Sequence, residues 1–98
     1  MVTVPGGKLA LGQTVQTAGV ASESETDQKF SDFVRSSIGR HVMGDWGDVS
    51  PEDKAANDTA LTTGERVLSA YEEPPMPKIW IITEWDRSVT TVLFPDEY

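Results

Sequence analysis

The sequence predicts an α+β domain in which two N-terminal helices pack on a three-stranded antiparallel sheet, with room for a fourth strand. Apolar residues recur every three or four positions after residue 28, which is the period of a helix that buries one face. Three later segments, roughly 66–71, 78–84 and 89–94, are enriched in β-branched and aromatic residues and are separated by turn-forming stretches. A chain of 98 residues suits a single domain.

The first residues predict a flexible N-terminal arm over 1–12. This segment is rich in glycine and small residues and contains the break Pro5-Gly6-Gly7. The single domain is therefore expected to span 13–98. Residues 14–17 are compatible with a short strand, which would widen the sheet to four strands.

The first helix is predicted from about Ser24 to Gly44. A hydroxyl near its start can accept hydrogen bonds from the free amides of the first turn, and Gly44 provides a C-terminal stop. The apolar stripe that should face the core consists of Phe30, Phe33, Val34, Ile38, His41 and Val42.

A second, shorter helix is predicted from Ser50 to Gly64. Ser50 is placed as its N-cap, and Pro51 stands at the first helical position, where a missing amide costs nothing. The acidic residues that follow complement the positive end of the helix dipole. Its apolar face is thin and made of small residues, so another element can approach it closely.

The sheet predicted for the last third of the chain has one side that two helices cannot cover. Residues 72–77 contain three prolines and are expected to be an extended connector, because proline cannot donate to a strand ladder. The middle strand is apolar on both alternating sides. The uncovered side carries either Trp80 and Ile82 or Ile79 and Ile81. It is a candidate surface for homodimerisation or a partner, unless the N-terminal arm folds over it.

Charge and composition restrict the classes of function. Eight basic against sixteen acidic residues give a net charge of -8, which disfavours direct nucleic-acid binding and favours a basic protein partner. The chain has no cysteine, which excludes disulfides, thiol nucleophiles and thiolate metal sites. It shows neither a signal-peptide pattern nor a long apolar run, so we expect no membrane partner and a cytoplasmic location.

The segment 44–53 is the most distinctive part of the sequence, with four carboxylates and one tryptophan between the two predicted helices. We call it the acidic bend. Trp46 and Trp85 both stand in predicted loops beside aspartates, where a tryptophan either contacts a partner or folds inward to cover the turn. The predicted partner-binding residues are Asp45, Trp46, Asp48, Glu52, Asp53, Asp58 and Trp85.

Catalytic alternatives have less support in the sequence. His41 is the only histidine, and with Asp45 and Asp48 it could form a metal-dependent hydrolase or nuclease site. The favoured interpretation is a hydrogen-bonded, partly buried histidine that closes the first helix. The acidic bend departs from the calcium-loop pattern, and the chain lacks a nucleophile elbow and a phosphate-binding loop. We therefore expect no catalytic residues, no resident metal and no cofactor.

Several longer motifs resemble a family of short bacterial proteins carried on plasmids and conjugative elements. The resemblance runs from about Leu11 to Tyr98 and implies mobile-element cargo, a setting in which acidic proteins often disable host defence. No activity or site residues follow from it. The motifs are Arg40-His41, the Gly-Asp-Trp-Gly-Asp run 44–48, Glu52-Asp53, Asn57, Gly64, the segment 66–71 and the segment 78–95.

Three functional hypotheses follow from these observations. The first is a non-catalytic acidic protein of a mobile genetic element, which inhibits a nucleic-acid-handling host defence protein, such as a CRISPR effector or a restriction enzyme, by occupying its basic surface. The second is a small metal-dependent hydrolase or nuclease centred on His41, Asp45 and Asp48. The third is a homodimeric regulatory or structural protein that associates through the open sheet face.

Overall fold

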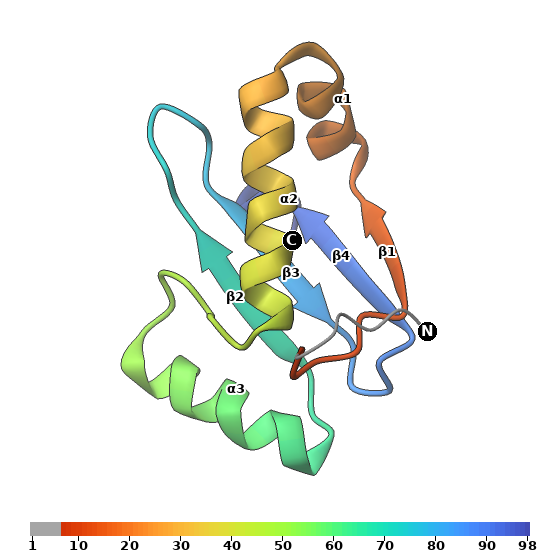
Figure 1. Cartoon of the computed structure of the whole chain (residues 1–98), viewed down its shortest axis with the longest axis vertical. Helices are drawn as coiled ribbons and strands as arrows, with labels where there is room; N and C mark the ends of the chain where they lie inside the picture. The colour runs from red at the N-terminus through yellow and green to blue at the C-terminus, as the bar shows by residue number, and fades with distance from the viewer. Residues whose placement is uncertain (1–6) are drawn as a thin grey trace.

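The computed structural model describes residues 7–98 and has the predicted α+β architecture (Figure 1). The sheet has the strand order β1-β4-β3-β2; β1 runs parallel to β4, and the other neighbours are antiparallel. The antiparallel meander is therefore confirmed, and the N-terminal strand widens it in the parallel direction. The elements are β1 (Gln13–Gln16), α1 (Ala18–Thr26), α2 (Gln28–Val42), α3 (Pro51–Thr63), β2 (Val67–Tyr71), β3 (Ile79–Thr83), β4 (Val89–Leu93) and the 3-10 turn η1 (Pro95–Glu97).

The first predicted helix is two helices in the structure. Asp27 adopts an extended conformation, and its carboxylate accepts hydrogen bonds from the amides of Lys29 and Phe30, at 3.0 and 3.3 Å. It thus ends α1 and caps α2, which is worth about 1 kcal/mol at a typical N-cap. Thr17 caps α1 in the same way through the amide of Val20. The prediction of one helix starting near Ser24 was wrong, because Thr17 already caps a helix at Ala18 and Asp27 breaks the helix before α2.

Two apolar clusters lie between the helices and the sheet, and α2 contributes to both. The upper cluster joins α1 and α2 to the middle of the sheet. The lower cluster lies beside the end of α2 and joins it to α3, β2 and the N-terminal segment. Ile38 of α2 packs against both. The upper cluster contains Val20, Phe30, Phe33, Val34, Tyr71, Ile79, Ile81 and Val92, and the lower one contains Leu9, Leu11, Val42, Trp46, Ala60 and Val67.

Residues 7–12, the described part of the predicted arm, belong to the packed domain. Leu9 and Leu11 are only 4% and 5% exposed, and both lie in the lower cluster. The amide of Lys8 donates to the carbonyl of Val42 at 2.8 Å. This part of the arm therefore packs beneath α2, and the apolar leucines explain why. The remainder of the predicted arm, residues 1–6, lies outside the described residues.

The third helix is attached differently from the other two. Ser50 caps it through the amide of Asp53 at 3.1 Å, and Gly64 ends it in the left-handed conformation with φ 79°, as the sequence predicts. Only Asn57 and Ala60 are buried along its thirteen residues. Figure 1 shows α3 beside the end of the sheet, below α2, with most of its surface turned outward.

Candidate functional site

The acidic bend closes the outer edge of β2. The amide of Ala70 donates to the carbonyl of Trp46 at 3.2 Å, and the carbonyl of Ala70 accepts from the amide of Asp48 at 2.7 Å. Gly47 forms an isolated parallel bridge with Ala70. The carboxylate of Asp48 then accepts from the amide of Glu72 at 2.9 Å. The bend thus satisfies backbone groups that an edge strand would otherwise leave open.

Gly47 is required for this close approach. Its φ is +73°, and a Cβ there would lie 2.0 Å from the carbonyl oxygen of Ala70 and 2.7 Å from the ring of Tyr71. No side chain fits at these distances. The Trp-Gly-Asp part of the motif is therefore explained by its packing against β2.

Asp45 fixes the N-terminal part of the acidic bend through hydrogen bonds. Its carboxylate accepts from the Nε and Nη2 atoms of Arg40, at 2.8 and 3.2 Å, and from the amide of Gly47. The hydrogen bond from Arg40 lowers the pKa of Asp45, and the same contact raises the pKa of Arg40. The hydroxyl of Tyr71 donates to the main-chain carbonyl of Asp45 at 2.6 Å. Both charged side chains are about half exposed, so the ion pair itself adds little stability.

Trp46 lies in the core, which corrects its placement on the predicted contact surface. Its side chain is 3% exposed and packs in the lower cluster. The indole Nε1 donates to the carboxylate of Asp58 at 2.9 Å, and its ring meets that of His41 edge-on at 5.7 Å between centroids. The backbone on either side of Trp46 is bonded to β2, which holds the bend against the domain with the indole inward.

The other predicted contact residues lie on the surface. The carboxylates of Asp45, Asp48, Glu52, Asp53 and Asp58 and the indole of Trp85 all belong to exposed residues. The five carboxylates lie along the acidic bend and α3, where Asp45, Asp48 and Asp58 have hydrogen-bond partners within the domain. Trp85, which is 67% exposed, stands in the β3–β4 hairpin near the opposite end of α3.

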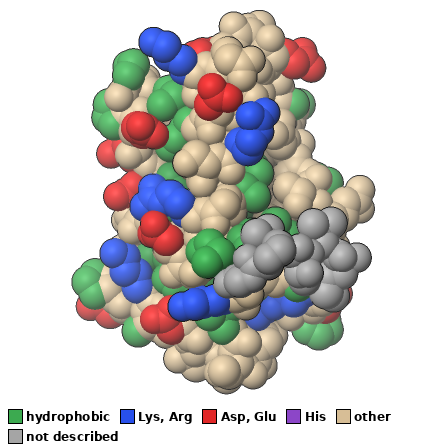
Figure 2. Space-filling model, viewed as in Figure 1, with side chains coloured by type: hydrophobic (Ala, Val, Ile, Leu, Met, Phe, Trp, Pro, Cys, Tyr) green, Lys and Arg blue, Asp and Glu red, His purple; other side chains and the backbone are tan. Residues whose placement is uncertain are grey.

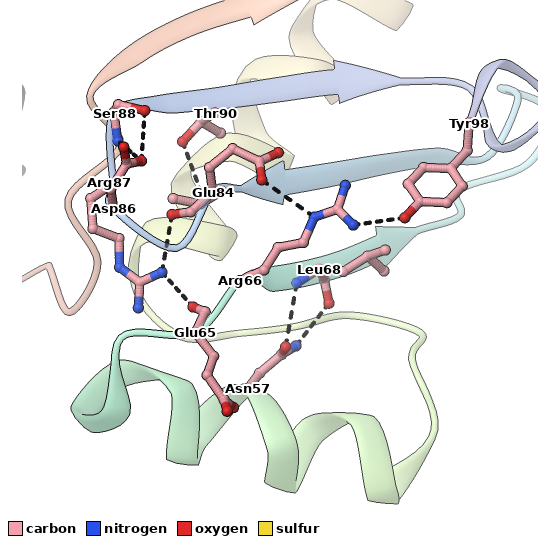
Figure 3. Close-up of polar contacts among 11 residues, drawn as sticks. Asn57, Glu65, Arg66, Leu68, Glu84, Asp86, Arg87, Ser88, Thr90 and Tyr98 are labelled. Carbon is pink, nitrogen blue, oxygen red and sulfur yellow. Dashed lines mark hydrogen bonds and ion pairs between the residues drawn. The ribbon is translucent and has the colours of Figure 1, made fainter.

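Polar contacts of three side chains, Asn57, Asp58 and Arg87, hold α3 and its C-terminal end against the domain, and we call them the polar clasp. The side-chain amide of Asn57 donates to the carbonyl of Leu68 at 2.8 Å and accepts from its amide at 3.3 Å (Figure 3). Asp58 accepts from the indole of Trp46. From the hairpin, Arg87 donates to the carbonyls of Ala60 and Glu65, at 2.8 and 2.6 Å.

The polar clasp could not be read from the sequence, although weak signals for it exist. Asn57 is a poor helix former in the middle of a small-residue face, which suggests a specific partner for its amide. Arg87 stands in a turn-forming run, Asp86-Arg87-Ser88, which places its long cationic side chain in the β3–β4 hairpin. Neither signal identifies the partner, because both contacts span more than ten residues of sequence.

His41 forms part of a buried chain of hydrogen bonds across the sheet. Its Nδ1 meets the Ser69 hydroxyl, its Nε2 lies 2.8 Å from the Thr83 hydroxyl, and Thr83 continues to Thr90 at 2.8 Å. Thr90 donates to the carbonyl of Leu11, which can only accept. Each preceding hydroxyl must then donate toward Leu11, so His41 carries its proton on Nε2 and accepts from Ser69 on Nδ1.

Burial keeps His41 neutral. Removal from water, with a smaller contribution from the positive charge of Arg87, lowers the pKa of His41 to about 4. Both ring nitrogens already have hydroxyl partners, and the ring is fully buried. This matches the structural interpretation of His41, as a hydrogen-bonded histidine near the end of the first long helix.

The geometry does not assemble the alternative metal site. His41 is bonded to strand hydroxyls, Asp45 to Arg40 and Asp48 to the amide of Glu72, so the three side chains do not converge. Within residues 7–98, no group of three histidine, aspartate or glutamate side chains is arranged to hold a metal ion. The hydrolase hypothesis therefore receives no geometric support from the described part of the chain.

The sheet face opposite α2 carries Trp80 and Ile82, whereas Ile79 and Ile81 belong to the core beneath the helices. Ile82 is only 3% exposed on this face. Tyr98 meets Trp80 edge-on at 5.6 Å between ring centroids. Arg66 donates to the Tyr98 hydroxyl at 2.7 Å and pairs with Glu84 at 3.6 Å (Figure 3). Dimerisation through this face stays a prediction.

Comparisons with protein-family models, with curated proteins and with solved structures give no match to this chain. The resemblance to plasmid-borne proteins therefore stays a prediction. None of the helices within residues 7–98 has the length and apolar character needed to cross a membrane.

Proposed function

We propose that this chain is a non-catalytic interaction domain that binds a basic partner protein through the outward surface of α3 and the acidic bend. The observation that carries the proposal is the attachment of α3. Its inner side is occupied by Asn57, Ala60 and the contact of Asp58 with Trp46, while Glu52 and Asp53 stand exposed on a helix that contributes little to the core. A helix held in this way is free to meet a partner along most of its length.

Charge supports a basic partner. Only three of the sixteen carboxylates form ion pairs within residues 7–98, with Arg35, Arg40 and Arg66. On the face seen in Figure 2, which includes α3, acidic and basic side chains are interspersed. Along α3, three carboxylates oppose the single Lys54. An acidic helix of this kind raises the association rate with a positively charged surface.

The partner we propose is a nucleic-acid-handling host defence protein, such as a CRISPR effector or a restriction enzyme. The channels of such proteins are basic because they bind phosphate backbones. An acidic domain that occupies the channel inhibits the enzyme without any chemistry of its own. The resemblance to plasmid-borne proteins supports this role, because a mobile genetic element gains by disabling host defence.

The test is a pull-down from host lysate with the tagged protein, followed by mass spectrometry. The wild type should capture a basic nucleic-acid enzyme at low salt and release it at high salt, since screening weakens exposed charge pairs. Glu52→Lys with Asp53→Lys should abolish capture. Asp45→Lys and Asp48→Lys are less informative, because these carboxylates also hold the bend against Arg40 and Glu72.

A matched control makes the same change of charge away from α3. Asp32 and Glu73 line an open groove between α2 and the β2–β3 loop, at the other end of the molecule from α3 (Figure 1). Asp32→Lys with Glu73→Lys should retain capture. Equal loss in both double variants would show that only net charge matters, and undiminished capture by the α3 variant would refute the proposed surface.

A further inference from the structure

The two edge strands of the sheet, β2 and β1, differ in whether their outward backbone groups are hydrogen-bonded. On β2, the outward backbone groups of Leu68 and Ala70 are bonded by Asn57 and by the acidic bend. On β1, the amide of Gln13 donates to the carbonyl of Ser88, and the parallel register continues to Gln16. The intervening residues Thr14 and Gln16 therefore direct their N–H and C=O groups away from β4.

These outward groups of β1 have no hydrogen-bond partner within residues 7–98. Its shortness, at four residues, is the only protective device of β1 itself, since Gln-Thr-Val-Gln contains no charge, proline or glycine. Thr14 and Gln16 are both exposed. Such an edge can accept another extended strand, whose main chain would supply the missing hydrogen bonds.

The charges that follow β1 in the sequence, together with Glu97 at its C-terminal end, favour a basic strand. No lysine or arginine occurs between Lys8 and Lys29, whereas Glu23, Glu25 and Asp27 follow β1 in α1 and at its end. At the C-terminal end of β1, Glu97 accepts from the Thr17 hydroxyl at 2.7 Å. A second copy of this chain would place the same carboxylates opposite one another, which costs energy.

We propose that β1 binds an extended basic segment of a partner protein as a fifth strand of the sheet. This inference takes from the proposed function only the positive charge of the partner. The two surfaces are separate, since α3 lies beside β2, at the opposite edge of the sheet from β1. The backbone of β1 would supply hydrogen bonds, and the surrounding carboxylates would select lysine and arginine side chains.

The experiment is an NMR titration of the labelled protein with two short peptides. One alternates lysine with valine, and the other alternates glutamate with valine, both with blocked ends. The lysine peptide should shift the amide signals of Thr14 and Gln16 and protect them from exchange with solvent. The glutamate peptide should leave them unchanged. Absence of shifts with the lysine peptide, or equal shifts with both peptides, would overturn the inference.

Two variants distinguish backbone pairing with β1 from non-specific electrostatic attraction of the lysine peptide. Thr14→Pro removes an outward amide and should weaken binding of the lysine peptide about tenfold or more, as expected for a lost hydrogen-bonded pair. Thr14→Ala retains the amide and should bind as the wild type does. If Thr14→Pro does not fold, Thr14→Lys provides the test, because its charge should repel the lysine peptide. Unchanged binding in the folded variant would contradict the inference.

Other occupants give different results. Protection of Thr14 and Gln16 in the peptide-free protein that rises with protein concentration would show that a second copy takes the edge. Protection at all concentrations would show that the chain covers the edge itself. Either result overturns the inference. Capture of a basic enzyme through α3 with no effect of Thr14→Pro would leave the proposed function intact and refute the β1 site alone.

Discussion

The helices α2 and α3 have similar lengths but are held to the domain by different forces. α2 buries Phe30, Phe33 and Val34 against the sheet, and its apolar stripe was evident from the sequence. α3 buries only Asn57 and Ala60 and is held by the polar clasp. The comparison suggests a division of roles: α2 makes the core, while α3 covers a strand edge and presents an acidic surface.

The largest loss of stability is expected from a substitution in the core face of α2. Phe30 is fully buried, with the rings of Phe33 and Phe94 at 6.2 and 5.8 Å between centroids. Phe30→Ala should lower the free energy of unfolding by about 3–5 kcal/mol, because it removes buried area and leaves a cavity. Urea denaturation measures this change. A loss of less than about 1 kcal/mol would contradict the assigned core.

The next largest effect is the pH response of His41, which lies at the end of α2. The pKa of His41 is about 4 in the folded protein and 6.5 when unfolded, so the unfolded state gains the proton first. Stability should be fully present above pH 6.5 and should fall by about 3 kcal/mol toward pH 4. The difference in urea stability between wild type and His41→Gln across this range isolates the effect. A constant difference would refute the neutral buried histidine.

A smaller loss is expected in the polar clasp. Asn57→Ala leaves the amide and carbonyl of Leu68 without their partner, which should cost about 1–3 kcal/mol. Thr59→Ala, an exposed change on the same helix, should alter stability by less than about 0.5 kcal/mol. Thermal or urea unfolding distinguishes the two. Equal effects would mean that Asn57 does not hold α3.

The smallest effect concerns the outward side of α3. Glu52→Lys with Asp53→Lys reverses charges favourable to the helix N-terminus, and the loss of stability should be about 1 kcal/mol or less. Circular dichroism should show an intact fold. A much larger loss would indicate inward contacts for these side chains, and it would also invalidate them as probes of partner binding.

Elements that depend on local sequence patterns were predicted correctly. Features that depend on contacts between residues far apart in the sequence were not. The stripe of α2, the Ser50 and Gly64 boundaries of α3 and the three meander strands all follow from local periodicity, caps and turns. The break at Asp27 was missed because several possible caps stand close together. The parallel direction of β1 depends on how the chain crosses the sheet, which local patterns do not encode.

The acidic bend illustrates the same limit at the candidate site. Its composition correctly placed a turn between two helices, and five of its predicted carboxylate contacts, including Asp58 beyond it, are on the surface. The inward position of Trp46 depends on backbone bonds to Ala70, more than twenty residues away. A loop tryptophan with polar neighbours therefore looked like a contact residue although it belongs to the core.

The central claim is that α3 is an acidic helix held by the polar clasp, with Ala60 as its one fully buried apolar side chain. Native-state hydrogen exchange, followed residue by residue at low denaturant, tests it most directly. Amides in the second half of α2 should exchange only through global unfolding, whereas those of α3 should exchange through a local opening of much lower free energy. Equal opening free energies for α2 and α3 would contradict the claim.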